Sequence, residues 1–440
     1  MKLTDGLITY TLNNGLRVFL RPVRFAPLVS VWAWYHVGSK NEAPGITGAS
    51  HWVEHMNFKG TKNIPKEQIK GMIEKQGGFW NGYTFIDQTT YMETLRKEGL
   101  EVALNLEAER MAGSLFEPEE VASERTVIIS ELRGNENDPG ELLDREVTAA
   151  AFRAHPYKWP VIGWQSDIET MTRNDLYNHY RAYYSPDNAL LVVTGDFEVN
   201  DAKGLIEKHY GPLKKWENGR RYVTTREPQQ RGERRVIVRR EGTTPLLQIS
   251  YHAPGLADDD YFALLLFDAL LAGPSGMNIF GGFSTAAGRS SRLYKDIIDG
   301  NLAASVGGFL LPTEHPYLYN TYAVLKSADD FEAVENAMYQ TIEDLIHRPV
   351  KKAELEKART QLRSKLAYEL EGITNMAHQI GFYSTIGHLE RYEKALEIFA
   401  SLTLEDARAA ALKYLGADNR TVGQFWPQPP EAAAMEGGAQ

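Results

Sequence analysis

A weak internal repeat constrains this chain more than any other feature of its sequence. The segments Met171 to Asn188 and Leu402 to Asn419 both pass from a helix-like pattern through a tyrosine to Asp-Asn. One offset of 231 relates five identical pairs in these segments: Thr172/Thr403, Asp175/Asp406, Tyr183/Tyr414, Asp187/Asp418 and Asn188/Asn419. Near the other end, LVSVWAW after Pro27 corresponds to LLQISYH after Pro245. We therefore predict two similar halves with strands and helices in the same order.

Hydrophobic patterning indicates that each half mixes strands and helices. LITYTL and LRVFLRP flank the turn Asn13-Asn14-Gly15, which is typical of a β-hairpin. The segments HWVEHMNF, LEVALNLEAERMAG and PEEVASERTVIISELRG have helical patterns, and NALLVVTG is typical of a buried strand. These patterns predict an α+β fold in which each half is an antiparallel-rich sheet packed with helices.

A change of composition near the middle of the chain sets the predicted boundaries. Residues 214–241 are basic and contain Gly, Pro and Gln. We expect an N-terminal half over 1–214, a linker over 215–233, a C-terminal half over 234–428 and a disordered tail over 429–440. The basic run is interpreted first as a solvated connector, and second as a docking surface for an acidic partner.

Composition excludes several classes of protein. The chain has 440 residues, no cysteine and a formal net charge of −10. The acidic balance argues against a general nucleic-acid binder, and the lack of cysteine excludes disulfides and thiolate metal sites. No signal peptide is visible, because the N-terminal residues include no apolar h-region and no small-residue cleavage site. No membrane span is visible either, because the longest apolar stretch, from Tyr261 to Gly273, is interrupted by Asp268 and is too short. We expect a soluble cytoplasmic protein, or a periplasmic one if a leader was removed.

The pentapeptide His51-Trp52-Val53-Glu54-His55 is the strongest indication of chemistry. On a helix His51 and His55 share one face, where two imidazoles can bind one Zn²⁺. Glu54 can flank that ion without binding it and take a proton from water. The pattern H-x-x-E-H is the inverzincin signature. The alternative is two surface histidines and a solvated glutamate on one helix.

A catalytic zinc site also needs a third protein ligand and an open position. The segment SERTVIISELRGNEND carries Glu124 and Glu131, which lie seven residues apart and therefore two turns along one helical face. Either carboxylate can supply the third ligand on this argument.

The chain resembles the M16 metallopeptidases, specifically the half-length M16B group that includes mitochondrial processing peptidase and small bacterial peptidases. The family motif is H-x-x-E-H followed about 76 residues later by a ligand glutamate within E-x-x-x-x-x-x-E, and His55 and Glu131 are 76 residues apart. Further matches extend along the chain, from Gly38-Ser39 to Ser291-Arg292-Leu293-Tyr294. The resemblance implies the duplicated M16/LuxS-like metallohydrolase fold.

The resemblance also assigns roles to the motif residues. It implies that His51, His55 and Glu131 bind Zn²⁺, that Glu54 is the general base, and that Glu124 orients a ligand histidine from outside the metal's own shell. The implied function is a zinc-dependent endopeptidase that cleaves peptides in an enclosed cavity.

The same resemblance implies how a peptide substrate is held. Residues 79–84 correspond to an edge strand that adds an extended peptide by β-augmentation. Asn81 and Gly82 are the implied substrate-binding residues on that strand. For Asn81, a structural role in a turn or an edge strand is the alternative.

One departure from the family pattern concerns the second half. Active members place an Arg and a Tyr, seven residues apart, after a Ser-Arg-Leu step. Allowing for one deleted residue, the corresponding positions in this chain hold Ile298 and Ala304. We therefore expect a heterodimer in which a related subunit supplies the Arg/Tyr pair. A homodimer that uses Tyr294, Arg292 or Arg289 instead is the alternative.

Two functions of another class remain open at this stage. Some members of the family have lost the metal site and serve as structural subunits, and a chain of this type can also bind peptides without cleaving them. The motif residues argue against the structural role, whereas a test for cleavage products would separate the enzyme from a peptide-binding protein.

Overall fold

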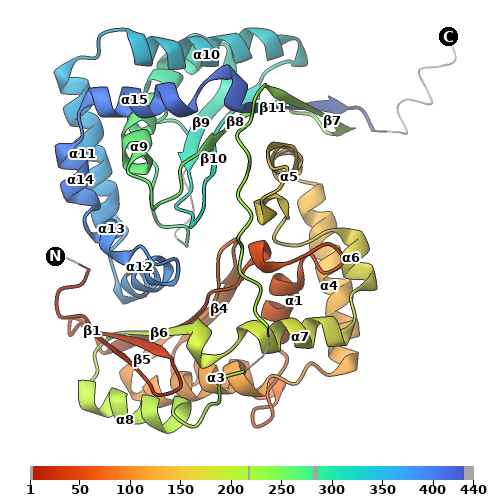
Figure 1. The fold of residues 1–440 in the computed structure, drawn as a ribbon, viewed down its shortest axis with the longest axis vertical. Coiled ribbons are helices and arrows are strands. Elements are labelled where there is room, and N and C mark those ends of the chain that lie inside the picture. The colour runs from red at the N-terminus through yellow and green to blue at the C-terminus, as the bar shows by residue number, and fades with distance from the viewer. Residues whose placement is uncertain (1–2, 217–218, 281–285, 431–440) are drawn as a thin grey trace, which may run out of the picture. The chain divides into compact units, whose positions relative to one another are not determined.

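The computed structural model describes residues 3–216, 219–280 and 286–430, which form two sheets and their covering helices (Figure 1). In the described part of the chain the strands are β1 (Ile8–Thr11), β2 (Arg17–Pro22), β3 (Leu28–Tyr35), β4 (Phe79–Thr84), β5 (Thr89–Arg96), β6 (Ala189–Gly195), β7 (Arg234–Glu241), β8 (Leu246–Ala253), β9 (Ala303–Leu310), β10 (Tyr317–Leu325) and β11 (Arg420–Gln428).

The α-helices of the same described residues are α1 (Ala49–Met56), α2 (Lys66–Glu74), α3 (Leu100–Gly113), α4 (Pro118–Glu136), α5 (Pro139–Ala151), α6 (Gln165–Thr170), α7 (Arg173–Tyr183), α8 (Val199–Tyr210), α9 (Asp260–Leu271), α10 (Phe331–His347), α11 (Lys352–Tyr368), α12 (Ile373–Thr385), α13 (Leu389–Glu393), α14 (Ala395–Ser401) and α15 (Leu404–Tyr414). None of them has both the length and the apolar character needed to cross a bilayer.

The chain divides into two compact units, each assembled from three segments. Unit 1 consists of Met1–Arg133, Trp159–Thr225 and Leu370–Glu393, and unit 2 consists of Gly134–Lys158, Arg226–Glu369 and Lys394–Gln440. The segment with α5 therefore belongs to unit 2 although it lies early in the chain, and the segment with α12 belongs to unit 1 although it lies late. The two sequence halves thus exchange one helical segment each.

The sheet of unit 1 has the strand order β1-β2-β6-β3-β5-β4. The predicted hairpin is confirmed by antiparallel pairing of β1 with β2, and only β2 and β6 run parallel among the paired strands described in this unit. Side chains of β3 alternate between the two faces. Trp34 packs on His378 and Phe382 of α12, whereas Tyr35 packs on Tyr91 and Tyr184 in the main core of the unit.

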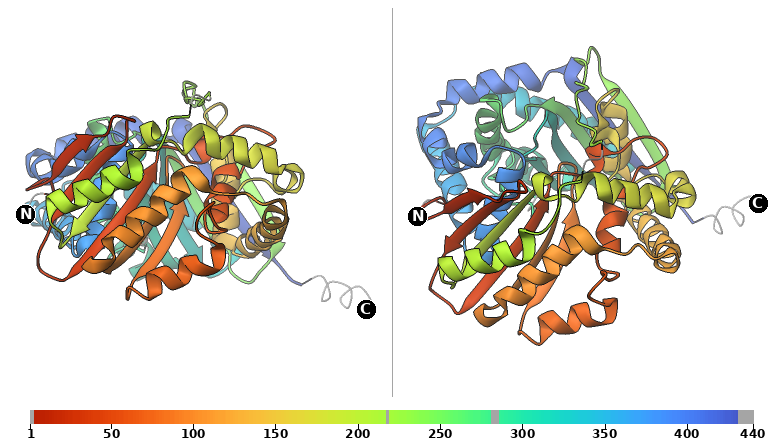
Figure 2. Two further views of the ribbon diagram at one scale, coloured as in Figure 1. Left: turned by 90° about the horizontal axis from the view of Figure 1, so that it is seen from below. Right: turned by 60° about the horizontal axis from the view of Figure 1, so that its bottom comes forward.

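Helices cover both faces of this sheet. Figure 1 shows α12 on one face and α3 with α8 on the other, and the left panel of Figure 2 shows the second pair in front of the strands. The close approach of α12 depends on Gly381, because a Cβ at that position would lie 1.9 Å from Nε1 of Trp34. A helix from the end of the sequence is therefore part of the scaffold on which the N-terminal elements are arranged.

The sheet of unit 2 repeats this plan with the order β7-β11-β8-β10-β9. Strands β7 and β11 run parallel and the other pairs are antiparallel, as are the corresponding strands of unit 1. Helix α5 packs on one face through the apolar cluster of Leu142, Leu143, Val147 and Phe425. The alternating residue Trp426 packs on Phe331 of α10, on the opposite face.

The predicted α+β fold with two similar halves is confirmed. The described residues between 219 and 233 form neither helix nor strand, and β7 begins at Arg234. The boundaries proposed at 1–214, 215–233 and 234–428 stay a proposal about the sequence halves, which the compact units do not follow segment by segment. Residues 431–440 of the predicted tail lie outside the described residues.

Candidate metal centre

Helix α1 carries the pentapeptide motif and is tightly anchored at its N-terminus. Gly48 precedes it with a φ of 87°, and a Cβ at Gly48 would lie 2.4 Å from the carbonyl oxygen of Ile162, so glycine is required there. The buried carboxylate of Glu42 accepts hydrogen bonds from the backbone N–H groups of Gly48 and Ser50, each at 2.7 Å. These contacts satisfy donors that the first helical turn leaves free.

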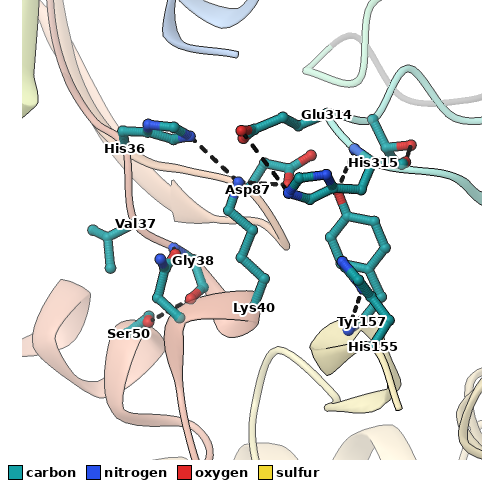
Figure 3. Close-up of polar contacts among 12 residues, drawn as sticks. His36, Val37, Gly38, Lys40, Ser50, Asp87, His155, Tyr157, Glu314 and His315 are labelled. Carbon is teal, nitrogen blue, oxygen red and sulfur yellow. Dashed lines mark hydrogen bonds and ion pairs between the residues drawn. The ribbon is translucent and has the colours of Figure 1, made fainter. Parts of the chain in front are cut away.

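The loop before α1 is held by further buried polar contacts (Figure 3). Lys40 forms an ion pair of 2.9 Å with Asp87, and both side chains are buried. The hydroxyl of Ser50 donates to the carbonyl oxygen of Gly38 at 3.1 Å. Because Trp52, Val53 and Met56 are fully buried in the core of unit 1, α1 is fixed in rotation and directs His51 and His55 away from that core.

The structure brings His51, His55 and Glu131 together. Nε2 of His51 lies 3.7 Å from one carboxylate oxygen of Glu131, and Nε2 of His55 lies 3.6 Å from the other. One donor atom from each of the three residues lies within 4.8 Å of the other two, and no other such trio of possible ligands occurs among the described residues. Glu131 is distant from the two histidines in the sequence, and the packing of α4 beside α1 brings it close to them.

This donor set fits a zinc ion. Contacts of 3.6 and 3.7 Å are too long for hydrogen bonds. They are close to the separation of about 3.4 Å between two ligands of a tetrahedral Zn²⁺ with bonds of about 2.0–2.1 Å. Two imidazoles and one carboxylate also leave a fourth position open, as catalytic zinc sites do. The side chain of Glu131 is 41% exposed, so the trio is accessible from solvent.

The two histidines differ in their electrostatic environment. Burial, together with the charge of His55, lowers the pKa of His51 to about 3, so His51 is neutral and one of its ring nitrogens has a free electron pair. Burial also lowers the pKa of His55, but the hydrogen bond to Glu124 and the nearby carboxylates outweigh it, so that the pKa of His55 is raised. Neutral imidazole is the form that binds metal ions.

Glu124 fixes the orientation of His55. Its carboxylate accepts a hydrogen bond of 3.0 Å from Nδ1 of His55, which leaves Nε2 facing Glu131. Glu124 is buried and also pairs with Lys59. Burial raises the pKa of Glu124, but these two partners outweigh the effect and lower it, so the carboxylate is ionised. A carboxylate behind a ligand histidine is a common arrangement in zinc sites.

Glu54 is buried beside the trio. Its Oε2 accepts a hydrogen bond of 2.6 Å from the hydroxyl of Thr84. Burial raises the pKa of Glu54 to about 7, against the opposing effect of Thr84. A carboxyl group with a pKa near neutrality can both accept and return a proton.

The segment predicted as an edge strand is confirmed as β4, at the edge of the unit 1 sheet. Asn81 is exposed there, and its side-chain oxygen accepts a hydrogen bond of 2.9 Å from the backbone N–H of Gly82. A Cβ at Gly82 would lie 3.0 Å from Phe58, which follows α1, and 3.1 Å from Tyr91 of β5, so this glycine lets the strand approach both side chains. No contact in the structure tests their role in binding a substrate.

The two positions of interest in the second half lie in unit 2. Ile298 belongs to the π-helix η5 (Tyr294–Asp299), and Ala304 lies exposed on β9. Of the three alternatives, Arg292 is engaged in a bidentate ion pair with Glu354, with distances of 2.6 and 2.7 Å. Tyr294 and Arg289 have no side-chain partner among the described residues.

Sequence reasoning missed Thr84 and Glu42. Thr84 ends the segment that the sequence marks as an edge strand, but its contact with Glu54 depends on how α1 packs against β4. Glu42 lies nine residues before His51 in a Gly/Pro-rich stretch, and nothing local indicates that it returns to the start of α1.

Comparison with known proteins decides the family. A family model described as insulinase (peptidase family M16) matches residues 17–164, and one described as the peptidase M16 inactive domain matches residues 170–362. The chain belongs to peptidase family M16.

Relatives of this M16 chain extend over nearly its whole length. The zinc protease PqqE of Helicobacter pylori is 28% identical over 413 residues, which cover 92% of this chain and 89% of that protein. A probable mitochondrial-processing peptidase subunit beta of Arabidopsis thaliana is 27% identical over 412 residues, covering 92% and 75%. The crystal structure of a protease from Helicobacter pylori matches with a TM-score of 0.89 and 27% identity, covering 96% of this chain and 99% of that one.

Proposed function

We propose that this M16 chain is a zinc-dependent endopeptidase in which His51, His55 and Glu131 hold the metal. The observation that carries the proposal is the convergence of two imidazole Nε2 atoms on the carboxylate of Glu131, at 3.7 and 3.6 Å. The names of relatives support it, since the Helicobacter pylori protein is called a zinc protease.

Glu54 is the proposed general base. A zinc ion bound by the trio supplies Lewis acidity, which polarises a carbonyl group and makes water a stronger acid. Glu54 would take a proton from water and return it to the leaving amine, which is consistent with its burial and its pKa of about 7. Thr84 holds one carboxylate oxygen and so sets the direction in which the other points.

Strand β4 is the proposed site of substrate binding. Its outer edge is unpaired among the described strands, and an extended peptide can add there through main-chain hydrogen bonds. Asn81 is exposed on this strand, and Thr84 at its end bonds to the proposed base. Binding through the main chain would place a peptide bond near Glu54 with little demand on peptide sequence.

We further propose that a related subunit completes the active site. Ile298 and Ala304 cannot donate side-chain hydrogen bonds, so this chain lacks at these positions the polar groups that would stabilise a developing oxyanion. The relative from Arabidopsis thaliana is named a beta subunit, which is consistent with assembly from unlike chains. The cytoplasm is the proposed compartment, and the periplasm is the alternative.

A homodimer is the second candidate, and one observation favours it in part. Arg289 is exposed and Tyr294 is half-buried in unit 2, both without a side-chain partner among the described residues. They can therefore act as donors, whereas Arg292 is occupied by Glu354. Activity of the purified chain alone, lost in the double variant Arg289→Ala/Tyr294→Phe, would establish this candidate and refute the need for a partner.

The test of the main proposal is direct. The purified chain should contain one zinc ion, by metal analysis, that a chelator removes. It should cleave a quenched fluorescent peptide when a related subunit carrying an Arg/Tyr pair is added. Metal-free protein, or metal-loaded protein that binds peptides without any product by mass spectrometry, would contradict the proposal in favour of a structural or a peptide-binding role.

A further inference from the structure

The basic segment noted in the sequence forms a regular strand at the edge of the unit 2 sheet. Strand β7 has eight residues, RRVIVRRE, and pairs with β11 in parallel. No strand within the described residues pairs with its other side. The segment is therefore not only a connector, because its last eight residues present backbone N–H and C=O groups along an open edge.

The corresponding edge of unit 1 is covered. Strand β2 has the position in the first sheet that β7 has in the second, since each runs parallel to the strand beside it. In unit 1 the hairpin strand β1 pairs with β2 from Ile8↔Leu20 to Thr11↔Arg17. The duplicated sheet thus has a place for one more strand beside β7, and no described strand fills it.

The side chains of β7 alternate between the two faces of the sheet. Val238 packs beside the α5 cluster on one face, and Arg235 reaches Glu335 of α10 on the other. Ile237 and Arg239 share the α10 face with Arg235 by the period of the strand. Ile237 is 50% exposed, and the side chain of Arg239 has no partner among the described residues. This face offers an apolar position next to an unpaired positive charge.

Charge indicates what can occupy this edge. If two copies of β7 paired antiparallel about Ile237, Arg235 would face Arg239 and Arg234 would face Arg240. Like charges directly opposite each other destabilise a strand pair, so a second copy of the chain is disfavoured in this register. Acidic side chains opposite Arg235 and Arg239, with an apolar one opposite Ile237, would instead form favourable cross-strand pairs.

A pocket lies at the C-terminal end of the same strand. It has a volume of about 360 Å³ and is lined by β7 and the turn after it, by the junction of α4 and α5, and by Phe425. Arg240 reaches into this region, where Glu136 lies 3.8 Å away. A pocket beside an open strand edge is the combination by which strand addition gains specificity, since the main chain supplies affinity and the pocket selects a side chain.

We propose that β7 is a docking edge for an extended, acidic segment of a partner protein, which adds to the unit 2 sheet as the strand that β1 provides in unit 1. Recognition requires the alternation Glu-x-Val-x-Glu or an equivalent, with the acidic residues facing Arg235 and Arg239. This inference is independent of the peptidase proposal, since it involves no residue of the metal centre.

The test uses a defined peptide probe. A fluorescent Thr-Glu-Thr-Val-Thr-Glu-Thr peptide is titrated into the full chain carrying Glu54→Gln, which removes the proposed general base, and mass spectrometry checks that the probe stays intact. The expected result is saturable binding together with slower hydrogen exchange at residues 234–241, but not at β4. Two control peptides separate the causes: one with Lys in place of Glu, and one with Pro beside the Val, which keeps the charge but cannot pair as a strand.

Charge-reversal variants complete the experiment. Arg239→Glu lies on an exposed position and should weaken binding of the Glu peptide about tenfold and improve binding of the Lys peptide. Arg363→Glu, on the exposed surface of α11, makes the same change of net charge and should alter affinity less than about twofold. Circular dichroism confirms that both variants are folded.

Three results would overturn the proposal: no protection of residues 234–241, equal binding of the Glu and Lys peptides, or equal effects of the two charge reversals. In that case the arginines serve only to keep an open edge from pairing, which is a known use of charge on edge strands.

Discussion

The two units of this chain have the same sheet but different chemistry. Thr172 caps α7 and Thr403 caps α15 in identical capping boxes with Asp175 and Asp406. Asn188 and Asn419 then bond to equivalent carbonyl groups: Nδ2 of Asn188 to Tyr183 and His36, and Nδ2 of Asn419 to Tyr414 and His252. These paired contacts confirm that the repeat of the sequence is a repeat of structure.

The difference lies in one pair of corresponding helices. In unit 1, α1 has eight residues and leaves His51 and His55 partly exposed. In unit 2, α9 has twelve residues, of which the eleven from Tyr261 to Leu271 are buried, and its one charged residue after the first turn, Asp268, accepts a hydrogen bond of 2.7 Å from Tyr319. The comparison teaches that the shared core specifies the scaffold, whereas a few polar positions on one helix decide which copy can do chemistry.

The largest expected effect tests whether the catalytic chemistry is confined to unit 1. Glu54→Gln should lower the rate of peptide cleavage by at least about 10³-fold, because the proposed base is lost, while zinc remains bound. Cleavage kinetics and metal analysis on the same preparation measure both effects. Glu119→Gln, an exposed change on α4, is the control and should leave both unchanged. Retained turnover in Glu54→Gln would show that another group activates water.

A second test concerns the hydrogen bond by which Glu124 orients His55 on α1. Glu124→Gln should weaken zinc binding about 10–100-fold. The uncharged amide is a weaker acceptor than the ionised carboxylate for the hydrogen bond from Nδ1 of His55, so it orients the imidazole less firmly. Competition with a metal-binding dye measures the affinity. Unchanged affinity would mean that the packing of α1 alone orients His55, and that the contact with Glu124 is incidental.

The contact between the edge strand and the base gives a smaller expected effect. Thr84→Val keeps the shape of the side chain but removes the hydrogen bond to Glu54, so kcat should fall about tenfold with KM unchanged. Thr84→Ser restores the hydroxyl and should restore most of the rate. A rise in KM, or no rescue by serine, would assign Thr84 to the packing of β4 instead.

The smallest expected effect concerns the equivalent helix caps of the two units. Thr172→Ala and Thr403→Ala each remove a helix cap and should cost about 1 kcal/mol of stability. Denaturant titration gives the loss, and hydrogen exchange shows whether it is felt in α7 or in α15. Clearly unequal costs would mean that the two copies have diverged in how much they depend on this cap.

Local patterns predicted most of the elements. The hairpin around Asn13-Asn14-Gly15, the helices of α3 and α4 and the buried strand β6 follow from period and turn chemistry, which act over a few residues. The spacing of His51 and His55 likewise places both on one helical face, whatever surrounds the helix. The repeat predicted two similar halves, because identical capping residues recur at one offset.

The exchange of α5 and α12 between the units was not predictable from these patterns. Each helix packs on its sheet through apolar or aromatic contacts with strands distant in the sequence, so its partner is decided by the whole assembly. The contacts of Thr84 and Glu42 have the same origin, since each joins residues whose approach depends on how a helix packs.

The sequence by itself determined where strands and helices form, that they form twice, and that one helix carries two histidines and a glutamate in metal-binding order. Only the tertiary structure decided that Glu131 reaches both imidazoles, that Glu124 supports one of them and that β7 is left at an open edge. The physical reason is range: backbone conformation responds to neighbours along the chain, whereas a ligand set and a free edge depend on side chains and strands brought together by packing.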